Sequence, residues 1–436
     1  MENYIGKIVS PYNKVDFIDS VRLSISQDNI EIEFPSTERN FNNIKTIIGI
    51  FNGIGKITLV NCQNTARSSG AGGIIKKYNV EYLFKGGHIH KPESIYFDNV
   101  NIKMSGLLDW TKISSINFTG KDLSIKKVKR ITIYKSDNYT IEIFPSHNIS
   151  LKREFNEINF KENIGLKISS LNKDINVWDY LHLIKELKKI FFILSNRDTK
   201  IDDTTFNRKE ELGITLFWAG SNSLGSPSYI NPKITFEDIK LELNEIIHNW
   251  FDKKDLHTSI ELILEKTINT QLSYENYFLN NCFAIETLHR RFNNYKLFDK
   301  SEFKSIKENI LKSIENNDLR KLIENNLAHI NEPNFRNRLT NYEADFSHLL
   351  PENQNVKNYI SKIVKTRNYL VHRGNSKNIF DEFDMLYASF FIETVVKINV
   401  YRILGIKNKL IEKLLIETGE KINSLYQSND RMRFED

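Results

Sequence analysis

The chain has 436 residues, of which 27% are charged and 40% hydrophobic, a composition typical of a folded protein with two or three domains. Its formal net charge of +6 is compatible with nucleic-acid binding but does not demonstrate it. No apolar run approaches the roughly 18 residues of a membrane-spanning helix. The N-terminus lacks an export signal, and Cys62 and Cys282 lie far apart. We therefore expect a cytoplasmic protein with reduced thiols and no membrane partner.

Short segments of strand character fill the first 170 residues. In Ile30–Phe34, apolar side chains alternate with Glu31 and Glu33, the period of a half-buried strand. Turn signals separate this segment from others of similar character, at 47–60, 80–84, 95–97, 100–108, 131–134 and 140–144. Short strands at regular intervals predict an antiparallel sandwich or barrel-like sheet.

The pattern becomes helical near Trp178. Residues 178–195 carry apolar side chains at helical spacing, 212–218 is a possible strand, and 220–232 is expected to be a loop. We thus predict an α+β multidomain chain. Its N-terminal domain, 1–253, is β-rich over 1–172 and mixed over 173–253, and an all-α bundle follows over 254–436. The predicted helices after Trp178 run over 236–251, 255–271, 274–294, 302–327, 354–373, 380–404 and 408–425.

Two features of the N-terminal part resemble ligand sites only weakly. The glycine-rich stretch 68–73 lacks both the Lys-Ser/Thr of a phosphate loop and the spacing of a dinucleotide site, so we predict a hairpin loop. His88 and His90 would share a face if they lay on a strand. No cysteine or carboxylate accompanies them at ligand spacing, which favours strand-end histidines over a metal site. We expect no metal and no cofactor.

The most informative segment is the predicted helix 354–373. Asn353 is its expected N-cap and Gly374 its expected C-terminal stop. At about 100° per residue, Arg367 falls in the middle of an apolar stripe, where a guanidinium is costly unless it is paired. Asn368 and His372 are four residues apart and share a flank. The stripe consists of Val356, Ile360, Ile363, Val364, Leu370 and Val371.

An arginine, an amide and an imidazole at one helix end suit phosphate chemistry. The Arg-x4-His spacing alone is a weak signal. On spacing, a catalytic pair and a helix-capping histidine beside a salt-bridged arginine are about equally supported. The place of the motif, at the end of a long helix in an all-helical half of the chain, favours the catalytic pair.

The segment Arg367-Asn368-Tyr369-Leu370-Val371-His372 resembles the R-N-x-x-x-H signature of HEPN ribonucleases. Residues 278–291, Phe-Leu-Asn-Asn-Cys-Phe-Ala-Ile-Glu-Thr-Leu-His-Arg-Arg, resemble an early helix of the ApeA-like HEPN group. The segment 236–239 and the pair Trp250-Phe251 resemble the junction of those proteins, and the β-rich half resembles the ApeA N-terminal domain.

This resemblance implies an anti-phage, abortive-infection effector. Its N-terminal domain, 1–253, would sense a phage component, and its HEPN domain, 254–436, would cleave RNA, with tRNA as the expected substrate. Some HEPN proteins carry a tyrosine two residues after the histidine, where this chain has Gly374. Chemistry that depends on that tyrosine is therefore not implied.

Metal-independent RNA cleavage needs a proton acceptor, charge stabilisation at the phosphate and a proton for the leaving oxygen. His372 is our candidate acid or base, Arg367 the phosphate-binding fork, and Asn368 a residue that orients the imidazole or holds phosphate. Lys365 and Arg373 would add charge for RNA binding. HEPN relatives dimerise so that two motifs line one cleft, and an Arg367 facing a partner would fit a two-fold homodimer.

Two other interpretations remain open. The bundle could be a HEPN module that holds nucleotide or RNA through Arg367 and His372 without cleaving it. Alternatively, the bundle could serve only as a dimerisation scaffold. The three hypotheses differ in whether substitution of these residues abolishes cleavage, binding or neither.

Overall fold

The computed structural model describes most of the chain and divides it into two compact units. The first unit comprises residues 1–226 and 235–244, and the second comprises 227–234 and 245–436. Our predicted domain boundary near Lys253 remains a prediction about functional domains. The described residues are 1–9, 17–26, 29–36, 44–70, 73–119, 123–126, 128–152, 157–208, 211–218, 224–225, 230–293, 295–327, 330–373 and 377–433.

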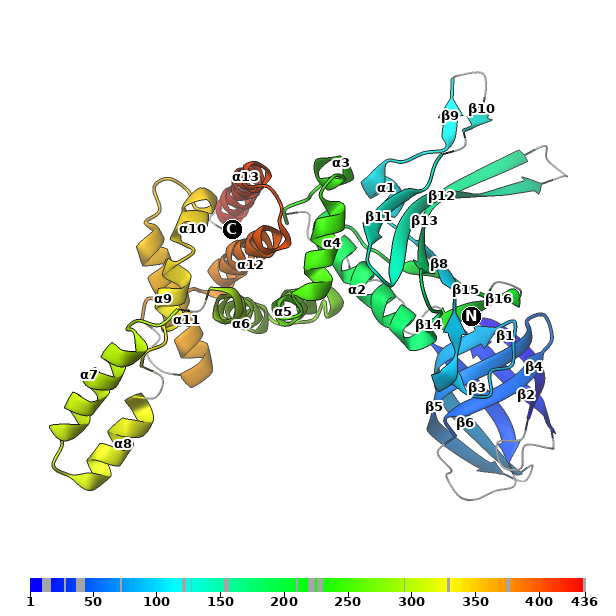
Figure 1. The fold of residues 1–436 in the computed structure, drawn as a ribbon, viewed down its shortest axis with the longest axis horizontal. Helices are drawn as coiled ribbons and strands as arrows, with labels where there is room; N and C mark the ends of the chain where they lie inside the picture. The colour runs from blue at the N-terminus through cyan, green and yellow to red at the C-terminus, as the bar shows by residue number, and fades with distance from the viewer. Residues whose placement is uncertain are drawn as a thin grey trace. The chain divides into compact units, whose positions relative to one another are not determined.

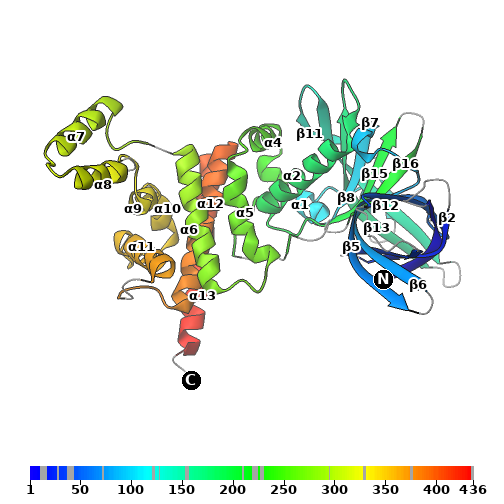
Figure 2. The same cartoon turned by 90° about the horizontal axis from the view of Figure 1, so that it is seen from below.

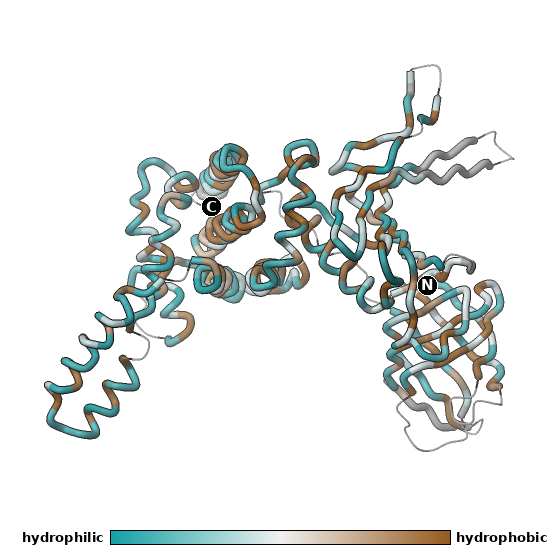
Figure 3. Tube along the Cα trace, viewed as in Figure 1, coloured by the Kyte–Doolittle hydropathy of each residue, from teal (hydrophilic) through white to brown (hydrophobic). Residues whose placement is uncertain are grey.

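A closed antiparallel barrel forms the first part of the N-terminal unit. The strand order β6-β3-β2-β1-β4-β5 closes because β5 also pairs with β6, and Figure 2 shows this ring. Ile30, Ile32 and Phe34 point into the barrel core, while Glu31 and Glu33 pair with Lys77. The alternation read from the sequence is thus the inside–outside pattern of a barrel wall. Figure 3 shows hydrophobic and hydrophilic residues interspersed along the barrel strands. The six strands are β1 (Glu2–Val9), β2 (Phe17–Ile25), β3 (Ile30–Ser36), β4 (Thr46–Phe51), β5 (Gly55–Gly70) and β6 (Gly73–Lys85).

Strand β6 also connects the barrel to an open antiparallel sheet of order β16-β15-β8-β13-β12-β11. All pairings among the described strands are antiparallel, as predicted. Gly70 of the glycine-rich stretch ends β5 and lies opposite Gly73, which begins β6, and this pairing confirms the predicted hairpin. The remaining strands are β7 (Tyr96–Phe97), β8 (Asn99–Met104), β9 (Ile116–Phe118), β10 (Leu123–Ile125), β11 (Ile131–Lys135), β12 (Tyr139–Lys152), β13 (Glu157–Ser170), β14 (Ile175–Asn176), β15 (Ile201–Arg208) and β16 (Glu211–Trp218).

Helix α2 (Val177–Ser195) packs against this sheet and confirms the helix predicted at 178–195. Tyr180 contacts Phe206 of β15, with ring centroids 6.0 Å apart, and Phe191 contacts Trp110 of α1 (Leu107–Thr111). Figure 1 shows α2 beside the sheet strands. Nearly every apolar residue of α2 is buried, so the helix completes the core of the sheet.

The second unit is helical, as predicted for a bundle. Helix α12 is buried along almost its whole length and packs against α6 and α13. Helices α7 and α8 form a hairpin that projects from the α9 side of this unit in Figure 1. The helices are α3 (Phe236–Ile239), α4 (Leu243–Asp252), α5 (Leu256–Ile268), α6 (Tyr274–Phe292), α7 (Lys300–Lys312), α8 (Asn317–Leu327), α9 (Phe335–Thr340), α10 (Glu343–Leu349), α11 (Val356–His372), α12 (Glu382–Leu404) and α13 (Asn408–Arg433), with α3 belonging to the first unit.

Two long predicted helices are each divided in the structure. The segment 236–251 breaks into α3 and α4 around Leu241, whose exposed side chain continued the apolar pattern without joining the buried face. The segment 302–327 breaks because the Asn316 side chain accepts the backbone N–H groups of Asp318 and Leu319, at 2.9 and 3.0 Å, and starts α8. The short helices α1, α9 and α10 were not predicted. Within the described residues, no helix has the length and apolar character needed to cross a membrane.

Candidate active site

Helix α11 carries the Arg-Asn-x-x-x-His motif, and its ends differ from the prediction. The Asn355 side chain, not that of Asn353, caps the helix by accepting the backbone N–H of Asn358 at 3.0 Å. At the other end, Arg373 adopts the left-handed conformation with φ of 51°. The expected stop at Gly374 lies outside the described residues.

One face of α11 packs into the bundle, but the expected stripe is only partly correct. Ile360 and Ile363 are buried together with Tyr359 and Thr366, whereas Val371 is 41% exposed. The Thr366 hydroxyl donates to the Lys362 carbonyl and accepts the backbone N–H of Phe380, each at 2.9 Å. The buried face therefore lies to one side of the expected stripe.

Arg367 lies at the edge of this buried face and makes its contacts within its own chain. Its side chain is 21% exposed, and its Nη2 lies 3.7 Å from Oε2 of Glu286 on α6. Nη1 donates to Oδ1 of Asn368 at 3.2 Å, and the guanidinium carbon lies 5.5 Å from the ring centroid of Phe335 on α9. The inward position of Arg367 is thus explained by these contacts and does not itself argue for a dimer. Its Nε–H is shielded from solvent and makes no hydrogen bond within the described residues.

Glu286 links the motif arginine to a cluster of basic groups. Its other carboxylate oxygen accepts from Nη2 of Arg290 at 3.0 Å. Arg338, which is 1% exposed, lies close enough to both Glu286 and Arg290 to feel their charges. Burial and the charge of Arg290 both lower the pKa of Arg338. With three guanidinium groups around Glu286, and Glu332 beyond, the neighbourhood of Arg367 retains a positive excess.

The buried imidazole of His289 completes this cluster. Arg338 Nη1 lies 3.0 Å from Nδ1, and the Asn341 side-chain amide lies 2.7 Å from Nε2. Because a guanidinium can only donate, Nδ1 accepts and the neutral ring carries its proton on Nε2, which pairs with the Asn341 amide when that amide is flipped so that Oδ1 faces the ring. Burial, with the charge of Arg338, lowers the pKa of His289 to about 4. His289 is therefore a neutral structural acceptor that holds Arg338 in place.

The remaining predicted site residues lie on the exposed side of α11. Asn368, His372, Lys365 and Arg373 are all exposed, and Arg373 lies over the Tyr369 ring at 5.9 Å. Among the described residues, no hydrogen bond or ion pair joins His372 to Arg367 or to any other side chain. One helix end thus presents a buttressed arginine, an amide in contact with it, and an accessible imidazole one turn from the amide.

Sequence reasoning assigned no role to the residues that hold Arg367. Glu286 lies within the segment that resembles an early HEPN helix, but no spacing rule links it to a residue 81 positions later. Phe335 lies on the unpredicted helix α9, so its contact with the guanidinium had no sequence signal. Cys282, one turn before Glu286, is buried, and this burial raises the pKa of its thiol. The face of α6 that meets Arg367 is therefore formed by Cys282 and Glu286.

The two N-terminal histidines that the sequence singled out lie outside the strands. His88 and His90 lie in the irregular segment that follows the end of β6 at Lys85, so the condition for a shared strand face is not met. Within the described parts of the chain, no three His, Cys, Asp or Glu side chains gather as potential metal ligands.

Comparisons with known protein families cover both units. The family model for ApeA N-terminal domain 1 matches residues 20–250, and the model for Apea-like HEPN matches residues 279–410. No curated protein and no solved structure matches the chain significantly. The second match includes Glu286, Phe335 and the whole of α11. The chain belongs to the ApeA family, with an ApeA N-terminal domain followed by an ApeA-like HEPN domain.

Proposed function

We propose that this protein is an anti-phage defence effector whose HEPN domain is a metal-independent endoribonuclease. ApeA-like HEPN domains point to anti-phage defence, and HEPN domains typically bind RNA and dimerise. The observation that carries the proposal is the arrangement on α11. Arg367 is braced by Glu286 and Phe335, and it contacts Asn368 beside the exposed His372.

Each residue then has a defined role in cleavage. The imidazole of His372 takes the proton of a ribose 2′-OH as that oxygen attacks phosphorus, or returns a proton to the departing 5′-oxygen. Arg367 stabilises the charge on the non-bridging oxygens, and its unpaired Nε–H is a donor that a phosphate oxygen satisfies once the side chain adjusts. Asn368 orients the imidazole or holds the phosphate. The P–O5′ bond breaks, leaving a 2′,3′-cyclic phosphate and a 5′-OH.

The exposed charges of α11 extend this site toward a longer RNA. Lys365 and Arg373 are both exposed, and Arg373 is placed over Tyr369. They neutralise phosphates next to the scissile one without distinguishing bases. The substrate we propose is RNA, with tRNA as the specific target and a phage protein that binds the N-terminal domain as the trigger.

One imidazole on each protomer is a reason to propose a homodimer with a composite site. Acid–base cleavage needs a proton acceptor and a proton donor, and two α11 helices across a two-fold axis supply both. Val371, one residue before His372, is 41% exposed and is the apolar side chain that such a contact would bury.

A non-catalytic RNA- or nucleotide-binding module is the second candidate. It is favoured by the His372 imidazole, which no side chain orients within the described residues. In this case Arg367 and the exposed lysine and arginine would hold phosphate while no bond breaks. A dimerisation scaffold would need neither Arg367 nor His372.

The decisive experiment incubates the purified protein with total tRNA, with and without extract of infected cells, and maps new 5′-OH ends. We expect cleavage by the wild type, with a rate about 10²–10⁴-fold lower for His372→Ala and Arg367→Ala. The exposed His348→Ala, on α10 of the same domain, is the matched control and should cleave normally.

Four results would each reject part of the proposal. Normal cleavage by His372→Ala removes its catalytic role. If the wild type binds tRNA but does not cleave it, even with the trigger present, the binding module is favoured. If His372→Ala and Arg367→Ala both protect against phage as well as the wild type, only the dimerisation scaffold remains. Cleavage should persist in EDTA, so loss of activity that added divalent metal restores would contradict the metal-independent mechanism.

A further inference from the structure

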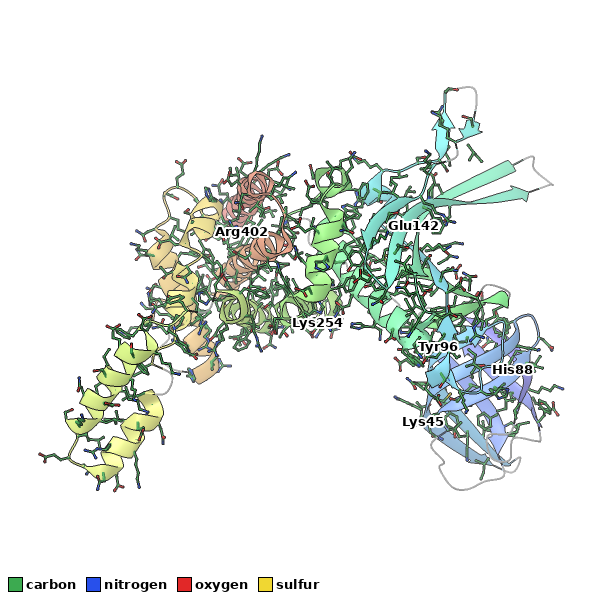
Figure 4. The ribbon with its side chains drawn as sticks, in the orientation of Figure 1. Lys45, His88, Tyr96, Glu142, Lys254 and Arg402 are labelled. Atoms are coloured by element: carbon green, nitrogen blue, oxygen red, sulfur yellow. The ribbon has the colours of Figure 1, made fainter. Side chains whose placement is uncertain are left out.

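The segment after β6 crosses the junction of the barrel and the open sheet and is tied to the barrel. The backbone N–H of Gly86 donates to the Lys56 carbonyl at 2.9 Å, and that of Ile89 to the Thr58 hydroxyl at 2.8 Å. His88 Nε2 lies 3.0 Å from the Gly49 carbonyl oxygen. Figure 4 labels His88 beside the barrel strands. The segment is therefore an anchored part of the N-terminal unit.

A pocket of about 580 Å³ lies along this segment. Its ionisable lining residues are His88, His90, Lys91 and Arg208, and none of the described residues that line it is an aspartate or glutamate. Pockets that bind small molecules have volumes of about 300–1,000 Å³. The volume of the pocket fits a small molecule, and the positive charge of its lining favours an anion.

The cationic groups differ in how firmly they are held. Arg208 donates from Nε to the Tyr96 carbonyl at 2.9 Å and lies over the Phe97 ring at 5.3 Å, so its guanidinium is positioned in advance. Lys91 and His90 are exposed, and their side chains make no hydrogen bond or ion pair within the described residues. Since a carbonyl only accepts, His88 Nε2 carries a proton toward Gly49, and its Nδ1 is the nitrogen left for a ligand.

The floor of the pocket is apolar, and its backbone segments are closely packed. Ile89 and Ile95 are buried, and Ile214 of β16 completes the apolar lining. Gly86 has a φ of 109°, and a Cβ there would lie 3.2 Å from the Gly213 carbonyl oxygen. Glycine is therefore required where the segment passes the start of β16.

We propose that this pocket binds a small phosphorylated ligand of the nucleotide class. The Lys91 and Arg208 cations, with the His90 imidazole, take the phosphate groups, and His88 Nδ1 accepts from a ligand O–H or N–H. The isoleucine floor takes an uncharged base or sugar face. The site lies wholly within the N-terminal unit and is independent of the nuclease proposal.

The test is isothermal titration of the full-length protein with ATP, AMP and inorganic phosphate. We expect ATP to bind the wild type and Lys91→Glu to weaken this binding about tenfold or more, because a charge-assisted contact is replaced by repulsion. Arg208→Gln should weaken it similarly. Lys45→Glu makes the same charge change at an exposed barrel residue outside the pocket and should bind ATP normally.

The different ligands and variants distinguish the possible causes of a binding signal. Tighter binding of ATP or AMP than of inorganic phosphate supports a nucleotide ligand. His372→Ala should not change ATP binding, because His372 lies in the other unit. Absence of ATP binding at millimolar concentration, equal loss in Lys45→Glu and Lys91→Glu, or equal affinity for phosphate and nucleotides would overturn the proposal.

Discussion

At the residue scale, the Glu286 carboxylate determines where the Arg367 guanidinium lies. Replacement by glutamine keeps the size of the side chain but removes the charge that attracts Arg367 across 3.7 Å. We predict that Glu286→Gln lowers the single-turnover RNA cleavage rate about tenfold, equivalent to about 1.4 kcal/mol of transition-state stabilisation, with a smaller effect on KM. Glu286 is a positioning residue, so Glu286→Asp should recover part of the rate.

Glu302→Gln on α7 is the matched control, because this carboxylate is exposed and makes no contact with Arg367. A Glu286→Gln enzyme that cleaves at the wild-type rate would show that Phe335 and Asn368 alone position the guanidinium.

His289 gives the helical domain a pH-dependent stability. Burial lowers the pKa of His289 from 6.5 to about 4. Between these two pH values the imidazole is therefore protonated in the unfolded chain but neutral in the folded domain. The stabilising effect is complete above pH 6.5 and is lost as the pH falls toward 4. Between about pH 7.5 and pH 5 we expect the free energy of unfolding to fall by about 2 kcal/mol through this residue.

Urea unfolding followed by far-ultraviolet circular dichroism measures this dependence. The His289→Gln variant lacks the titration, so its stability should change less over the same pH interval. Equal pH dependence in both proteins would mean that His289 is protonated in the folded state.

At the element scale, the start of α11 tests which asparagine caps the motif helix. The Asn355 side chain accepts the Asn358 N–H, so Asn355→Ala should cost about 1 kcal/mol of stability in urea unfolding. Asn353→Ala, two residues earlier and outside the cap, should be nearly neutral. If Asn353→Ala costs more stability than Asn355→Ala, Asn353 is the N-cap, as the sequence predicted.

At the scale of the whole molecule, the proposed dimer can be tested at Val371. An aspartate there would place a charge in an apolar contact between two α11 helices, so we predict that Val371→Asp raises the dimer Kd about tenfold or more in light scattering. The specific cleavage activity should then rise with protein concentration. Ile416→Asp changes a similarly exposed apolar residue of α13 and should leave the dimer intact. A monomeric wild type at micromolar concentration would contradict the composite site.

The fold was predictable wherever one local pattern corresponds to one buried face. Alternation in Ile30–Phe34 indicated a half-buried strand, and helical spacing in 178–195 indicated α2, because each element buries a single continuous face. Helices α9 and α10 are too short to show a period, and a break such as that at Asn316 depends on one side-chain cap. Barrel closure was only one of two predicted options, because it requires the pairing of β1 with β4 and of β3 with β6, which are far apart in the sequence.

By itself, the sequence determined the β-then-α order of the chain, the motif Arg367-Asn368-x-x-x-His372 and its place at a helix end, because periodicity and spacing are local properties. Only the tertiary structure decided that Arg367 turns toward Glu286 and Phe335, that His289 stays neutral against Arg338, and that His88 and His90 line a cationic pocket. These contacts join segments far apart in the chain, and packing rather than local preference selects them.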